Sequence, residues 1–307
     1  MTAEPVLVET SAGVVGVVLT SPPQPPRGAA VILPGVGSTR AGSNQMFVRI
    51  ASSLAAAGVS SIRFDYPGTG ESHFSPPRRW GETTREIIDW FRRTSGIAQV
   101  LLVADCSGVV AAHREVMSGR GVLGVAVVRP AFLGYWPRPS LRRRLRAVAG
   151  RVKRFPSTAL LRLRYGPADP KIQTLWSKDE LAGLARTGDL LVDLAERAPL
   201  WVLTADKDPA TPVLGRLQDR LAGGVDYELE VLTGVVPGGP PRPGVAEIAR
   251  STALWAARRL GDVQACRTPI SAGSGLWHEG VNAYQLRAPE GDSPQPAPTT
   301  RGDHANR

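Results

Sequence analysis

Short apolar runs recur along the first 260 residues and predict a series of buried strands. The runs are rich in Val, Ile, Leu and Ala and are bounded by Gly, Pro, Asp or Ser, which commonly end strands. Thr10-Ser11-Ala12-Gly13 separates the first two runs and is a hairpin signal. We expect strands at 6–9, 14–20, 29–33, 60–64, 100–104, 121–128, 200–204 and 227–232.

Helical patterns fill most of the intervals between these strands. We expect helices at 45–57, 83–93, 109–117 and 245–260. Strands that alternate with helices in this way predict an α/β protein, with a mostly parallel sheet flanked by helices on both faces. Because ligands of such sheets bind at the carboxyl ends of the strands, we look for the site in the segments that follow them.

The stretch from Val100 to Val110 predicts a strand, a sharp turn and a helix. Ala104 and Gly108 lie two residues before and two after Cys106, where only small residues let strand and helix approach closely. Cys106 therefore stands where a nucleophile elbow places its nucleophile. The following helix N-terminus is expected to lower the pKa of its thiol. Two alternatives remain: Cys106 is a small buried hydrophobe, or Ser107 is the nucleophile, although Val109 then fits a small position badly.

Composition indicates an ordinary globular chain with an unusual charge. Of the residues, 42% are hydrophobic and 21% charged, but the formal net charge is +10. Cys106 and Cys266 lie far apart and show no disulfide framework, which fits a reducing compartment. No signal peptide and no apolar run of about 18 residues is visible, so we expect a cytoplasmic protein.

Four motifs together resemble the α/β-hydrolase superfamily over roughly residues 5 to 260. They are the elbow and the segments Leu33-Pro34-Gly35-Val36-Gly37, Phe64-Asp65-Tyr66-Pro67-Gly68-Thr69-Gly70-Glu71-Ser72 and Leu203-Thr204-Ala205-Asp206-Lys207-Asp208-Pro209. A cysteine elbow is similar to the dienelactone-hydrolase branch, and the Cys-Ser-Gly form is similar to bacterial hydrolases of polysaccharide-export and exosortase systems. The resemblance implies the α/β-hydrolase fold with a helical cap.

The resemblance also implies a role for each matching residue. Cys106 would be the nucleophile, and the backbone N–H groups of Ser107 and Val36 would form the oxyanion hole. Asp208 matches the acid that orients the catalytic histidine. The alternative for Asp208 is a turn residue, because Asp-Pro favours turn initiation.

The catalytic histidine itself is missing from its expected place. In the family it follows the last strand, and here Pro237 stands there, in the segment from Leu232 to Pro241. His73, directly after the Asp65–Ser72 motif, is the best substitute within the core, although a solvated loop histidine is the simpler interpretation. His113 lies on the helix after the elbow, and His278 and His304 lie in the C-terminal tail.

A strongly basic segment separates the two parts of the predicted core. Between Arg138 and Arg164 there are ten basic residues and no acidic one, around an apolar helical stripe from Leu141 to Phe155. Three interpretations compete: a solvated helix, a helix on an anionic membrane, or a clamp for an anionic substrate. For substrate or anion binding the candidates are Trp136, Arg142, Arg143 and Arg146.

The sequence thus predicts a core at 1–130 and 199–261, a basic helical cap at 131–198 and a mostly disordered tail at 262–307. The first functional hypothesis is a hydrolase of an ester or thioester that uses Cys106. The alternatives are an acyltransferase, or a binding or scaffold protein that has lost turnover. We expect a small-molecule acyl substrate, peripheral contact with an anionic membrane or ligand at most, and no cofactor, metal or nucleic acid. The sequence does not indicate the oligomeric state.

Overall fold

The computed structural model describes residues 1–35, 38–72, 80–130, 186–208, 210–221, 224–233 and 242–261. Strands rich in Val, Leu and Ala form its centre, and β3, β5 and β7 are buried along their whole length. The strands are β1 (Thr2–Thr10), β2 (Gly13–Ser21), β3 (Gly28–Leu33), β4 (Val59–Phe64), β5 (Val100–Asp105), β6 (Val122–Val128), β7 (Leu200–Ala205) and β8 (Tyr227–Leu232).

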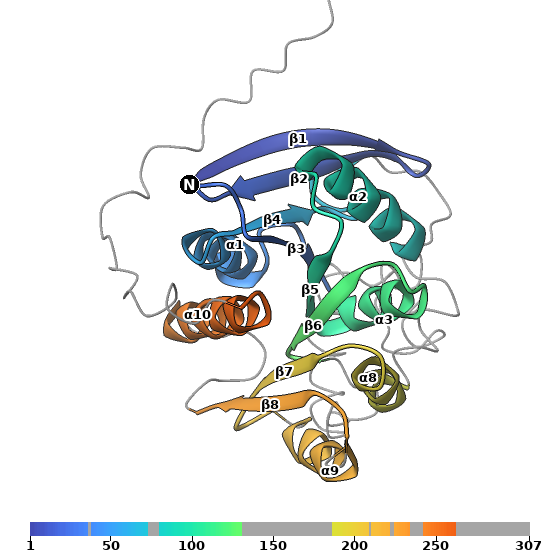
Figure 1. Cartoon of the computed structure of the whole chain (residues 1–307), viewed down its shortest axis with the longest axis vertical. Helices are drawn as coiled ribbons and strands as arrows, with labels where there is room; N and C mark the ends of the chain where they lie inside the picture. Colours follow the sequence, from blue (N-terminus) through green and yellow to red (C-terminus); the bar gives the residue numbers. More distant parts are fainter. Residues whose placement is uncertain are drawn as a thin grey trace, which may run out of the picture. The chain divides into compact units, whose positions relative to one another are not determined.

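These strands form one sheet in the order β1-β2-β4-β3-β5-β6-β7-β8, as Figure 1 shows. β1 and β2 form an antiparallel hairpin, and β2 also pairs antiparallel with β4. All other neighbours are parallel. β5 therefore lies inside the parallel part, between β3 and β6, and its carboxyl end is bordered by theirs.

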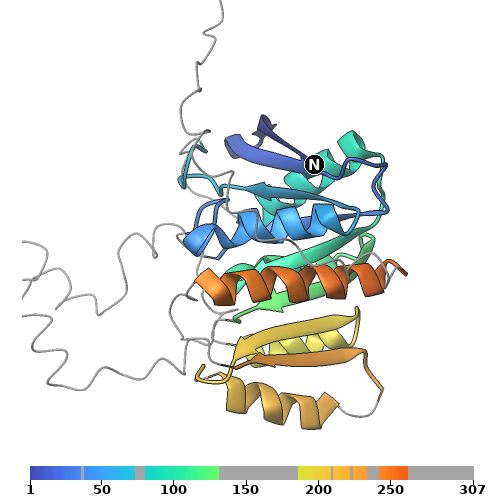
Figure 2. The ribbon, with the colours of Figure 1, turned by 90° about the vertical axis from the view of Figure 1, so that its left-hand side faces the viewer.

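Helices cover both faces of the sheet (Figures 1 and 2). α1 (Met46–Ala56) and α10 (Arg242–Arg259) pack side by side on one face, where Trp201 of β7 stacks on Trp255 of α10. The other face carries α2 (Trp80–Ser95), α3 (Val109–Met117), α8 (Thr187–Ala195) and α9 (Thr211–Leu221). Burial of both faces is the reason why the parallel strands are apolar throughout rather than alternating.

The predicted α/β architecture and all eight predicted strands are confirmed. Helices α8 and α9 are additions. α8 falls in the range that we assigned to the cap, yet Leu191 and Leu194 pack in the sheet-facing core, so the core includes residues from 186 onward. The rest of the predicted cap, at 131–185, and the predicted tail at 262–307 lie outside the described residues.

No helix in the described ranges combines the length and the apolar character that crossing a bilayer requires.

Candidate active site at the carboxyl end of β5

Cys106 has a backbone conformation that few residues other than glycine adopt. It follows the last residue of β5 with φ = 56°, and a short 3-10 turn, η2 (Cys106–Gly108), leads directly into α3. A left-handed conformation costs a non-glycine residue about 1–2 kcal/mol, so the surrounding structure must hold it. Such strain is concentrated at functional sites, and a sharp strand-to-helix turn is where a nucleophile elbow holds its nucleophile.

Two glycines close the turn around Cys106. A Cβ added at Gly108 would lie 2.5 Å from the Leu33 carbonyl oxygen, and one added at Gly35 would lie 2.9 Å from the Cβ of Cys106. Both separations are far below van der Waals contact, so neither position accepts a side chain. The prediction that the residue two after Cys106 must be small therefore has a direct cause, which is the approach of α3 to the end of β3.

The Cys106 thiol is less acidic than a free cysteine. Burial, the largest cause, and the neighbouring Asp105 carboxylate together raise its pKa to about 11. Hydrogen bonding from Ser107 and the charge of Arg129 oppose these effects without cancelling them. Our expectation of a lowered pKa was wrong, because desolvation and the charge of Asp105 outweigh these opposing interactions.

An ion pair that the sequence analysis did not identify lies beside the thiol. Arg129, the residue after β6, donates from Nε and Nη2 to the same Asp105 oxygen, at 3.2 and 2.8 Å. Burial raises the pKa of Asp105, and the charge of Arg129 opposes that shift. A signal did exist in the sequence, since Arg129 is a charged residue directly after a strand that neighbours β5.

Asp208 follows β7, at the same end of the sheet. Its Oδ1 accepts a hydrogen bond from the N–H of Ala210 at 2.8 Å, and its carbonyl oxygen accepts one from Thr211. These bonds form the turn that begins α9, as the turn interpretation of this residue predicts. The turn uses one carboxylate oxygen and leaves Oδ2 to interact elsewhere.

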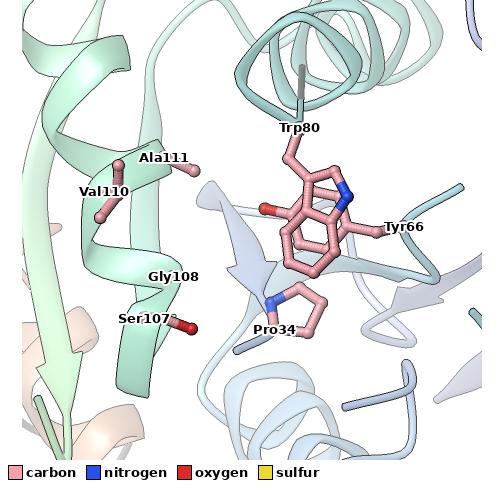
Figure 3. Close-up of a pocket in the computed structure, with 7 residues that line it drawn as sticks. All are labelled: Pro34, Tyr66, Trp80, Ser107, Gly108, Val110 and Ala111. Carbon is pink, nitrogen blue, oxygen red and sulfur yellow. The ribbon is translucent and has the colours of Figure 1, made fainter. Parts of the chain in front are cut away.

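An apolar pocket adjoins the elbow on the α2 and α3 side (Figure 3). Its walls include the rings of Tyr66 and Trp80, which stack with centroids 4.1 Å apart, and the Ser107 hydroxyl points from the elbow toward it. Its volume is about 10 Å³, which is room for one water molecule. The remaining lining residues are Pro34, Gly108, Val110 and Ala111.

Solved structures of similar fold include hydrolases. A serine hydrolase homologue from Coxiella burnetii superposes with a TM-score of 0.53 at 15% identity, over 82% of this chain and 97% of that one. A monoacylglycerol lipase from Paleococcus ferrophilus gives 0.52 at 20% identity, over 84% and 100% of the two chains. The chain has the α/β-hydrolase fold. A Pyrococcus furiosus esterase is also similar, with a TM-score of 0.55 at 11% identity, over 84% and 90%.

No family model matches the sequence, and neither does any curated protein. The α/β-hydrolase fold is thus established by three-dimensional similarity alone.

The Asp65–Ser72 motif has a structural role in this α/β-hydrolase fold. Arg40 forms ion pairs with the buried Asp65 and with Glu71. The Ser72 hydroxyl donates to the Asp65 carbonyl at 2.7 Å and accepts from the N–H of Gly16 at 2.9 Å. The motif therefore ties β2, β4 and the segment before α1 together, and it places Tyr66 against Trp80.

Of the four histidines, the structure describes only His113. Its Nε2 lies 3.1 Å from Asp193 Oδ2, so it links α3 to α8. The predicted base His73 and the predicted oxyanion residue Val36 lie outside the described residues. So do the candidates for substrate or anion binding, Trp136, Arg142, Arg143 and Arg146. The structure thus brings Cys106, Ser107 and Asp208 to the same end of the sheet as Arg129.

Proposed function

We propose that this protein cleaves an ester or thioester by transferring the acyl group to Cys106. The observation that carries the proposal is the left-handed conformation of Cys106 in a turn that Gly35 and Gly108 close. A buried cysteine with only a packing role has no need of a strained backbone. The hydrolases and esterases that share the fold support ester chemistry at this position.

In the proposed reaction, Cys106 Sγ attacks the acyl carbonyl carbon and a tetrahedral intermediate forms. Its negative oxygen would accept hydrogen bonds from the N–H of Ser107 and of Val36. The carbon–oxygen or carbon–sulfur bond to the leaving group then breaks, and the leaving alcohol or thiol takes up the proton that the Cys106 thiol lost. Water attacks the resulting thioester and releases the acid and the free thiol.

The raised pKa sets the pH dependence of the first step. Only the thiolate attacks, and below a pKa of about 11 its fraction rises roughly tenfold for each pH unit. We expect acylation to accelerate with pH throughout the neutral range unless a base assists it. We propose His73 as the base and Asp208 as the residue that orients it. Asp208 would use Oδ2, the carboxylate oxygen that takes no part in the turn.

The high pKa also favours a second candidate function. A poorly ionised thiol and an acid already used in a turn suit a protein that accepts an acyl group slowly and passes it to an amine or alcohol, or that only binds its ligand. We propose the acyltransferase as the alternative enzyme and the binding or scaffold protein as the alternative without turnover.

We further propose that the basic segment binds an anionic part of the substrate or an anionic membrane surface. The sequence supports this with ten basic and no acidic residues between Arg138 and Arg164. Trp136, Arg142, Arg143 and Arg146 are the residues assigned to that contact. Thioesters of a phosphate-bearing carrier would satisfy both this charge and the chemistry of Cys106.

Intact mass after exposure to p-nitrophenyl acetate tests the proposal, with nitrophenol release followed in parallel. Continuous release that Cys106→Ala abolishes would establish the hydrolase. An acetyl adduct of one equivalent without continuous release would favour the acyltransferase. Neither adduct nor release, from folded protein and with acyl-CoA also tried, would overturn the catalytic proposal and leave the binding protein.

Two histidine variants then locate the base. If His73 removes the thiol proton, His73→Ala lowers the acylation rate at pH 7, and the loss disappears at high pH, where the thiolate forms unaided. His113→Ala is the matched control, because His113 pairs with Asp193 between two helices and should leave the rate unchanged. Equal rates for His73→Ala and wild type would exclude His73 as the base.

A further inference from the structure

Arg129 shares the strained backbone of Cys106, and a packing role does not account for it. Its φ is 52°, and apart from Cys106 the other described non-glycine residues with positive φ are Asn44 and Gln45, which adjoin the start of α1. The Arg129 N–H still donates to the Leu203 carbonyl of β7 at 2.8 Å. The sheet pairing therefore continues through Arg129, and the chain bends at this residue.

This conformation places the guanidinium between two anionic groups and the thiol. Arg129 binds Asp105 through Nε and Nη2, and its charge also interacts with Cys106 and Asp208. Burial lowers the pKa of Arg129, but these negative neighbours more than compensate. Within the described part of the chain, Nη1 donates to no acceptor, and 23% of the side chain is exposed to solvent.

The order of the strands explains why this position matters. β6 lies between β5, which carries the nucleophile, and β7, which is followed by Asp208. A cation at the end of β6 is therefore near both. The positive charge of Arg129 can stabilise Cys106 when its thiol becomes an anionic thiolate.

We propose that Arg129 is a positioning residue that supplies a fixed positive charge to Cys106, with Asp105 as the group that holds it there and limits its effect. This inference rests on the proposed function of Cys106 and deepens it. The guanidinium stabilises the anionic thiolate before attack. It cannot take a proton from the thiol or from water, because arginine does not titrate in the accessible range.

Acylation and deacylation of Cys106 then require different groups. In acylation the thiolate electron pair forms the new carbon–sulfur bond, and the leaving group departs with the electrons of its own bond and takes up the proton that the thiol lost. A fixed cation assists this step. Deacylation by water needs a proton acceptor, which Arg129 cannot be. Arg129 therefore favours loading of Cys106 over its hydrolysis.

The test is the rate of Cys106 alkylation by iodoacetamide between pH 7 and pH 10, in a Cys266→Ser background. This rate reports the thiolate and does not require esterase activity. Three variants are compared with wild type: Arg129→Asn, Asp105→Asn and the double variant. Asn is chosen at 129 because it tolerates left-handed backbone, and the double variant leaves no buried charge unpaired.

We expect Arg129→Asn to alkylate about tenfold more slowly at a given pH and Asp105→Asn about tenfold faster, because an adjacent charge shifts a pKa by a unit or more. The double variant should lie between them. Loss of an anchoring contact alone would expose the thiol and speed both single variants. Equal rates in folded wild type, Arg129→Asn and double variant would overturn the proposal.

The alkylation result is separable from the fate of the proposed function. If wild type forms no acyl adduct with p-nitrophenyl acetate while the variants still show the expected order, Arg129 tunes the thiol and the hydrolase proposal fails. If the adduct forms but the order is absent, the hydrolase proposal stands and Arg129 has no part in it.

Discussion

At Gly108 the backbone of the elbow lies against the end of β3, and a single methyl group would separate them. Gly108→Ala must move the start of α3 or the Leu33 carbonyl, from which an added Cβ would lie 2.5 Å. We expect a loss of about 2–3 kcal/mol in the free energy of unfolding and loss of Cys106 acylation. Urea unfolding and intact mass measure the two effects.

The matched control is Gly215→Ala, inside α9. An added Cβ there has no atom within 4 Å, so the same substitution should raise stability by about 0.5–1 kcal/mol, through helix propensity alone. If both variants lose stability equally, the loss in Gly108→Ala is not caused by close packing at the elbow.

The strain at Cys106 itself can be measured by deleting the side chain in two ways. Cys106→Ala removes the thiol and keeps the left-handed φ of 56°, whereas Cys106→Gly also removes the steric conflict. We expect Cys106→Gly to be the more stable of the two by about 1 kcal/mol in urea unfolding. A more stable alanine variant would mean that the turn relaxes once the thiol is gone.

Between α2 and α3, a buried carboxylate opposes folding at neutral pH. The side chain of Glu115 is 1% exposed, and among the described residues its carboxylate forms an ion pair only with Arg85, whose Nε lies 3.4 Å away. Burial raises the pKa of Glu115, with Arg85 opposing the shift. A raised pKa means that the protonated acid favours the folded state. That contribution is present below the ordinary glutamate pKa of about 4.3 and is lost as the pH rises through the raised value.

Glu115→Met should therefore stabilise the protein at pH 7 by about 1–2 kcal/mol, since an apolar side chain of similar size has no desolvation cost. Thermal unfolding at pH 7 and pH 4 checks this, and the advantage should shrink at pH 4, where the glutamate is protonated. An advantage that is the same at both pH values would show that packing, and not charge, distinguishes the two side chains.

At the level of helices and strands, the sequence correctly predicted elements that an apolar pattern alone determines. The run Val100–Val103 is buried from both sides, so its composition identified β5, and Val109–Met117 became α3 with the predicted bounds. α9 went unpredicted, although Leu214, Leu217 and Leu221 have helical spacing and are buried.

The site was less predictable, because its properties arise between elements. The acidity of Cys106 depends on how deeply the thiol is buried and on Asp105 and Arg129, which reach it from two different strands. Asp105 directly precedes Cys106 in the sequence, but neither the burial of the thiol nor the approach of Arg129 can be read from the local sequence. Likewise, Asp208 as a turn residue and Asp208 as an acid have the same sequence signature.

For the whole molecule, the net charge of +10 predicts salt-dependent binding to anionic surfaces. We expect co-flotation with vesicles that contain phosphatidylserine at low ionic strength and release at about 1 M salt, where the screening length falls to about 3 Å. Replacing Arg142, Arg143 and Arg146 together with alanine should weaken this binding more than the change in net charge explains.

The control removes the same charge from exposed positions of the described fold, Arg93, Arg197 and Arg216. If both triple variants lose vesicle binding equally, only the net charge matters and the basic segment is not a specific contact.

The order of the strands has a consequence for synthesis on the ribosome. From β5 onward, each new strand joins the same growing edge of the sheet in the order in which it is made. The elbow and its flanking strands β3 and β6 are complete once Val128 has emerged, but β7 begins only at Leu200. At usual elongation rates the roughly seventy intervening residues take about 4–14 s. During that interval the nascent chain holds its nucleophile turn while β6 presents an open edge, so chaperone contact should be most valuable then.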